Sequence, residues 1–174
     1  MTRHGLKLAL LIVGMATVGC DQVSKHVAST LLAGAATQSF LGDTLRLEYA
    51  ENAGAFLSLG AQLPAWARTA LFSVGTSILL IACGISILRR RLSRIGLLGW
   101  CLVLAGGASN LIDRVVHGQV VDFLNVGIGR LRTGIFNVAD VAIMLGVGLL
   151  VLQSTGRVDE TRREDRDTST KCRE

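Results

Sequence analysis

Proline and aromatic residues are scarce in this chain. Its 174 residues include one proline, and Phe, Trp and Tyr together make up only 5%. Half of the residues are hydrophobic and the mean hydropathy is +0.49, which is typical of a helical membrane protein rather than a water-soluble domain. The 20 glycines agree with this interpretation, because glycine lets membrane helices approach one another closely.

Motifs for metal or nucleotide chemistry are also missing. The four cysteines are widely and irregularly spaced, which matches no zinc pattern and predicts no disulfide framework. The sequence has no His-Glu-x-x-His helix, no Gly-x-Ser-x-Gly elbow and no phosphate-binding loop. We therefore expect no metal and no cofactor. The formal charge of +5 arises from short basic clusters between apolar segments, which indicate membrane topology rather than a nucleic-acid partner.

Four apolar segments are candidates to cross a bilayer as helices, which takes roughly 20 residues each. They cover residues 6–32, 65–88, 95–112 and 135–152. Most Lys and Arg residues lie before the first segment, between the second and third, or after the fourth. Because positive charge stays on the cytoplasmic side, we expect both termini in the cytoplasm.

The expected fold class is an all-α integral membrane protein with four transmembrane helices and a small β segment on the outer face. Residues 44–49 alternate between apolar and polar side chains and predict a short strand. Residues 115–134 predict a further strand, or a surface half-helix or loop. The membrane domain would cover residues 1–156, and the charged residues 157–174 predict a disordered cytoplasmic tail.

Two aspartates stand out from the apolar background. Asp122 lies in a short apolar frame, and Asp140 opens the fourth apolar segment, 18 residues later. A carboxylate at the edge of a hydrocarbon core is costly, and chains usually keep one there for function. Two carboxylates that share a proton can activate water for peptide hydrolysis. The pair therefore predicts an acid–base site.

Further residues lie at a similar predicted depth, near the outer end of the segments. They are Asp21, Lys25, Asn52, Gly54, Asn110, Asp113, Arg114 and Asn137. Asp21 and Lys25 are four residues apart and share a helix face. Each group also has a structural interpretation: an intrahelical ion pair for Asp21 and Lys25, a helix end for Asp113 and Arg114, and interhelical hydrogen bonds for the asparagines. Ion pairing of Lys25 with Asp21, and of Arg114 with Asp113, would orient the helices.

Five blocks together resemble the lipoprotein signal peptidases (signal peptidase II), which are four-span aspartyl proteases of the bacterial cytoplasmic membrane. The blocks cover residues 21–25, 51–56, 106–114, 121–123 and 136–140, in that order, on a frame of residues 6–153. The resemblance implies that Asp122 and Asp140 are catalytic and that the other polar residues surround them. Two departures, Ala55 directly before Phe56 and Ser109 before Asn110, would reshape the substrate groove.

The resemblance also implies a substrate and a place of action. Diacylglyceryl-modified prolipoproteins would be cut before the lipidated cysteine, near the outer face of the cytoplasmic (inner) membrane. Membrane lipid is the expected surrounding, and we expect a monomer.

Three other interpretations remain open at this point. A small proton-coupled transporter would also use intramembrane carboxylates, but would carry polar residues through the full depth of a segment. The chain could itself be a lipoprotein, because Cys20 follows an apolar run; Thr17, however, stands where such signals favour leucine. A passive helical scaffold leaves Asp140 unexplained.

Overall fold

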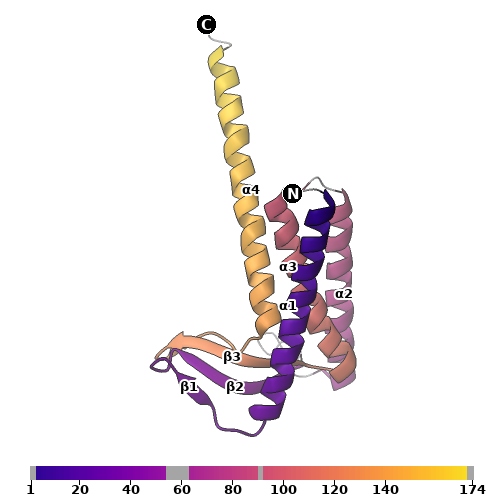
Figure 1. The fold of residues 1–174 in the computed structure, drawn as a ribbon, viewed down its shortest axis with the longest axis vertical. Helices are drawn as coiled ribbons and strands as arrows, with labels where there is room; N and C mark the ends of the chain where they lie inside the picture. Colours follow the sequence, from indigo (N-terminus) through magenta and orange to yellow (C-terminus); the bar gives the residue numbers. More distant parts are fainter. Residues whose placement is uncertain (1–2, 54–62, 90–91, 172–174) are drawn as a thin grey trace.

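Four long helices form the main body of the protein. The structure, a computed structural model, describes residues 3–53, 63–89 and 92–171. The helices are α1 (Arg3–Leu31), α2 (Ala65–Arg89), α3 (Arg94–His117) and α4 (Val138–Lys171). They run side by side with alternating direction, so both termini lie at one end of the bundle and the sheet lies at the other (Figure 1). All four predicted segments are helical.

The helices have the length and composition that a membrane requires. Within the described residues, His4–Leu31, Ala70–Ile87 and Arg94–His117 are long and apolar enough to cross a bilayer, and Val138–Ser154 is a shorter apolar stretch at the start of α4. Large apolar side chains are exposed along these helices, as expected where lipid rather than water surrounds the protein.

Glycines allow α3 to pack closely against its neighbours. A methyl group added at Gly106 would lie 2.5 Å from the backbone oxygen of Ala139 in α4. At Gly107 it would lie 2.7 Å from the side chain of Leu80 in α2. At Gly106 a side chain is excluded because the near atom is backbone, whereas at Gly107 the Leu80 side chain would have to shift. Both glycines permit the close helix approach that the composition predicted.

A small antiparallel sheet covers the end of the bundle. Its strands are β1 (Gln38–Phe40), β2 (Leu45–Asn52), β3 (Val120–Ile128) and β4 (Leu131–Arg132), in that spatial order. The strand predicted over residues 44–49 is thus confirmed as β2. Ala28 of α1 and Leu32, just after the end of α1, pack with Phe123 of β3. This contact anchors the sheet on the helices and places the neighbouring Asp122 at their junction.

The segment after α3 is a β-hairpin, and the alternative of a surface half-helix over residues 115–134 is wrong. Gly118 ends α3 in the left-handed conformation, with φ of 78°. The chain then pairs with β2, which supplies backbone hydrogen-bond partners that a half-helix would leave unused.

The C-terminal segment also differs from expectation. Residues 157–171, predicted to be disordered, continue α4 as a helix to Lys171. Low hydrophobicity beyond residue 156 therefore does not mark the end of the helix.

Candidate active site

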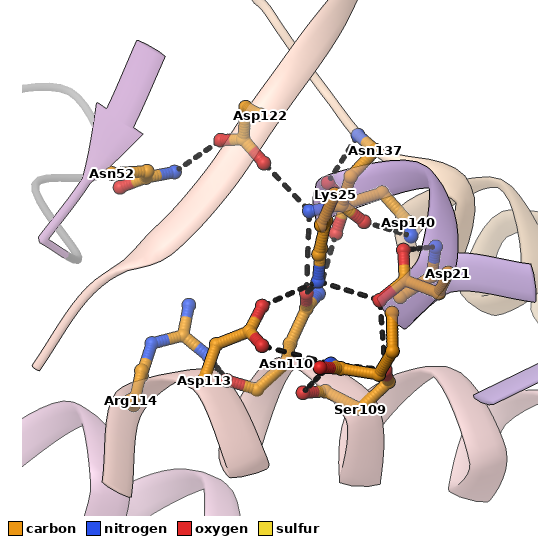
Figure 2. Close-up of polar contacts among 12 residues, drawn as sticks. Asp21, Lys25, Asn52, Ser109, Asn110, Asp113, Arg114, Asp122, Asn137 and Asp140 are labelled. Atoms are coloured by element: carbon orange, nitrogen blue, oxygen red, sulfur yellow. Dashed lines mark hydrogen bonds and ion pairs between the residues drawn. The ribbon is translucent and has the colours of Figure 1, made fainter. Parts of the chain in front are cut away.

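Asp122 and Asp140 meet where the sheet joins the bundle. Asp122 lies on β3, and Asp140 lies in the first turn of α4 (Figure 2). Asn137 links them: its side-chain nitrogen donates to Asp122 Oδ1 at 2.6 Å, and its side-chain oxygen accepts the backbone N–H of Asp140 at 2.9 Å. The predicted convergence of the two aspartates is therefore present in the geometry, and an amide connects them.

The start of α4 holds the Asp140 carboxylate in place. Asp140 Oδ2 accepts the backbone N–H of Asn137 at 3.2 Å, while Asn137 accepts the N–H of Asp140. This reciprocal pair is a capping box, which satisfies backbone donors at a helix start. The positive end of the helix dipole lies at the same place.

Asp122 is buried between amide donors. Only 3% of the residue is exposed, and Asn52 donates to its Oδ2 at 3.0 Å. Loss of solvent raises the pKa of Asp122 to about 6, and the charge of Asp140 adds to the increase, while the hydrogen bonds from Asn52 and Asn137 oppose it. A carboxyl group with such a pKa can hold or release a proton near neutral pH.

Lys25 joins α1 to α3 beneath the aspartate pair. Its ammonium lies 2.6 Å from both Asp21 Oδ2 and Asp113 Oδ2, and it donates to Asn110 Oδ1 at 2.8 Å. Asn110 in turn donates to Asp140 Oδ1 at 2.9 Å. Because the ammonium has three donors and three close acceptors, its charge is compensated although only 4% of the residue is exposed.

Asp21 connects α1 to the start of α4. Its Oδ1 accepts the backbone N–H of Ala139 at 2.8 Å, which fixes the turn that carries Asp140. Its Oδ2 accepts the hydroxyl of Ser109 at 2.7 Å. Asp21 is thus both the intrahelical ion-pair partner of Lys25 and part of the support around Asp140.

Sequence reasoning overlooked two members of this network. Gln22 donates to Ser109 Oγ at 3.0 Å and to Asp113 Oδ1 at 2.8 Å. Ser109 was noted as a departure from the family pattern, yet it is fully buried and links α1 to α3. Its position one turn before Asp113, on the same α3 face, was a usable signal.

Arg114 does not have the predicted partner. Asp113 pairs with Lys25, and the Arg114 side chain donates instead to the backbone oxygen of Asn110 at 3.3 Å (Figure 2). The ion pair predicted between Arg114 and Asp113 is therefore wrong, because Lys25 from α1 reaches Asp113 in the folded chain. Gly54, together with Ala55 and Phe56, lies outside the described residues.

The chemistry of the site is that of carboxyls and amides. Among the residues that the structure describes, no cluster of three His, Cys, Asp or Glu side chains is arranged to hold a metal ion. The central pair, Asp122 and Asp140, can divide one proton between them, since two close carboxylates do not both ionise easily. Such a pair can take a proton from water and give one to a substrate.

Comparison with known proteins identifies the family to which this chain is similar. A family model described as Signal peptidase (SPase) II matches residues 13–155. A lipoprotein signal peptidase of Photorhabdus laumondii is 36% identical over 117 residues, covering 66% of this chain and 68% of that protein. One of Chlorobium phaeobacteroides is 33% identical over 156 residues, covering 84% and 90%.

A solved structure shows a similar fold. It is described as "Bacterial membrane enzyme structure by the in meso method at 1.9 A resolution", has 27% sequence identity and gives a TM-score of 0.74. The similarity covers 83% of this chain and 91% of that one. These comparisons favour a membrane peptidase over a transporter.

Proposed function

Because the chain belongs to the signal peptidase II family, whose members are membrane peptidases that process prolipoproteins, we propose that it is an aspartic endopeptidase. Its substrates are diacylglyceryl-modified prolipoproteins, cut immediately before the lipidated cysteine. The main support is the convergence of Asp122 and Asp140 on Asn137, at the junction of sheet and bundle.

The proposed placement is the bacterial cytoplasmic (inner) membrane, with both termini in the cytoplasm and the site near the outer face. Support comes from the two termini lying at the end of the bundle opposite the sheet (Figure 1). Arg89 at the end of α2 and Arg94 at the start of α3 lie at that same end. The substrate's acyl chains then stay in lipid while its scissile bond reaches the interface.

In the proposed mechanism, Asp140 is ionised and Asp122 is protonated. Asp140 takes a proton from water, and the water oxygen bonds to the scissile carbonyl carbon while Asp122 gives its proton to the carbonyl oxygen. The resulting diol collapses as Asp140 passes its proton to the nitrogen, the C–N bond breaks, and Asp122 recovers its proton. The burial of Asp122, which raises the pKa of its carboxyl group, supports this division of roles.

The surrounding residues position the pair and the substrate. Asn52, Asn110 and Asn137 each hold a catalytic carboxylate, and such amides can also bond an extended peptide backbone. Asp21, Lys25 and Asp113 form the charged support beneath. Arg114 supplies a positive charge beside the pair. Gly54 stays an expectation from the family resemblance.

The direct test is cleavage of a purified prolipoprotein in its diacylglyceryl-modified and unmodified forms, with EDTA present. We expect a single cut before the lipidated cysteine, and little cleavage of the unmodified form. A metal-dependent activity would contradict the aspartic mechanism. Folded protein that leaves the modified substrate intact would contradict the proposed function.

The pH dependence follows from Asp122. Its proton is retained up to a pKa of about 6 and is lost above it, so kcat/KM should fall as pH rises beyond about 6. The measurement is kcat/KM on the lipidated substrate between pH 4 and pH 9. A rate that instead rises through pH 6 would assign Asp122 the role of the base and exchange the two aspartates.

A further inference from the structure

An apolar groove and a polar pocket follow one another along the seam between α1 and α3. The groove has a volume of about 820 Å³ and lies between α1, the end of α2 and α3. Its lining is almost entirely apolar and includes Leu11, Met15, Val18, Ile87, Trp100 and Leu104. It therefore provides a cavity for hydrocarbon.

The polar pocket lies further along the same helices, toward the sheet. Its volume is about 440 Å³, and its lining includes His26, Tyr49, Glu51, His117 and Gln119. Lys25 and Asp113 also border it, but they are bonded to each other in the buried network that includes Asp21.

One face of α1 connects the two cavities. Leu11, Met15 and Val18 line the groove, and Gln22 and His26 line the pocket, at spacings of three and four residues. Residues so spaced share a helix face. The seam is thus apolar along its inner part and polar at its outer end, in the same order as the acyl chains and headgroup of a lipid.

We propose that this seam binds one molecule of phosphatidylethanolamine from the membrane. The groove volume of about 820 Å³ holds roughly 27 methylene groups, if each fills about 30 Å³ as a water molecule does. That number corresponds to two acyl chains of ordinary length. The rise along α1 from Leu11 to Gln22 is about 16 Å, close to half of a hydrocarbon core of about 30 Å.

Charge complementarity selects the headgroup. His26, His117 and Gln119 carry N–H groups that can donate to a phosphodiester. The carboxylate of Glu51 can accept from an ammonium group. A zwitterionic phosphoethanolamine satisfies both, whereas a phosphoglycerol headgroup brings a negative charge to Glu51 without an ammonium.

The lipid site is separate from the aspartate pair. Val121 lines the polar pocket, and the next residue on β3, Asp122, bonds to Asn52 and Asn137. Successive strand side chains point to opposite faces. The seam therefore binds a lipid of the bilayer rather than the diacylglyceryl group attached to a substrate at the scissile bond.

The test measures lipid binding without cleavage. Protein purified in detergent and stripped of lipid is titrated with dipalmitoyl phosphatidylethanolamine or dipalmitoyl phosphatidylglycerol, and bound lipid is counted by native mass spectrometry. We expect one phosphatidylethanolamine per chain, with at least fivefold tighter binding than phosphatidylglycerol. Glu51→Gln should abolish that preference.

Matched tryptophan variants locate the acyl chains. Leu11→Trp fills the groove and should weaken phosphatidylethanolamine binding at least tenfold. Ile12→Trp changes a neighbouring residue of similar exposure, 58% against 60%, that is absent from the groove lining, and binding should stay unchanged.

Three results would overturn the proposal. They are equal binding of the two lipids, equal weakening by the two tryptophans, and displacement of phosphatidylethanolamine by an uncleavable diacylglyceryl peptide. The last would assign the groove to the substrate. Because none of these measurements depends on peptide cleavage, the lipid-binding test can be interpreted even if the proposed function is wrong.

Discussion

Replacing Asp140 by asparagine should reduce kcat on the lipidated substrate by about a thousandfold or more, because removal of a positioned acid or base typically costs 10²- to 10⁴-fold. Asparagine keeps the size of the side chain and can still accept the hydrogen bond from Asn110, but it cannot take a proton from water. Asp122→Asn should have a similar effect, since it removes the proton donor.

The double variant should be little worse than either single one, because the two aspartates act as a unit. Asp43→Asn is the matched control. Asp43 lies on the exposed connection between β1 and β2, away from the site, and pairs with Arg46. Replacing Asp43 should therefore leave kcat unchanged. Thermal unfolding of each variant in detergent shows whether the fold is kept. Near-normal cleavage by a folded Asp122→Asn or Asp140→Asn protein would refute the mechanism.

Replacing Lys25 by methionine should lower the free energy of unfolding by about 3–5 kcal/mol, the cost of leaving buried charges without their partner. Methionine keeps the unbranched chain but removes the ammonium that lies 2.6 Å from both Asp21 and Asp113. Both carboxylates would remain almost fully buried. The measurement is the free energy of unfolding from a denaturant titration in mixed micelles.

A surface ion pair provides the comparison. Arg46→Met breaks the ion pair between Arg46 and Asp43, in which the two side chains are 35% and 42% exposed, and should lower the free energy of unfolding far less than Lys25→Met does. Adding Asp113→Asn to Lys25→Met should restore part of the lost stability, because one unpaired charge is removed. Equal destabilisation by Lys25→Met and Arg46→Met would show that the buried network does not hold the helices together.

Much of the architecture was predictable from the sequence. The four apolar segments become four helices, and alternation over residues 44–49 corresponds to β2. The approach of Asp122 to Asp140 was also predictable, since each lies in a distinctive frame and the resemblance paired them. The roles of these residues stay predictions that the cleavage experiments test.

Other features depended on contacts between distant segments. The choice between a hairpin and a half-helix after α3 was settled by pairing with β2, which lies some 70 residues earlier in the chain. The support from Ser109 and Gln22 was missed because they bond across helices, and spacing along one helix does not identify a partner on another. The helix over residues 157–171 was missed because low hydrophobicity was taken as disorder.

The sequence by itself determined the membrane character, the four helices and the two carboxylates, because hydrophobicity and its period act locally along the chain. Only the tertiary structure decided which charges pair. Lys25 reaches Asp113 as well as Asp21, leaving Arg114 bonded to the Asn110 backbone. The physical reason is that a buried charge is stabilised by whichever opposite charges packing brings within hydrogen-bond distance, and sequence spacing reveals such neighbours only within one helix.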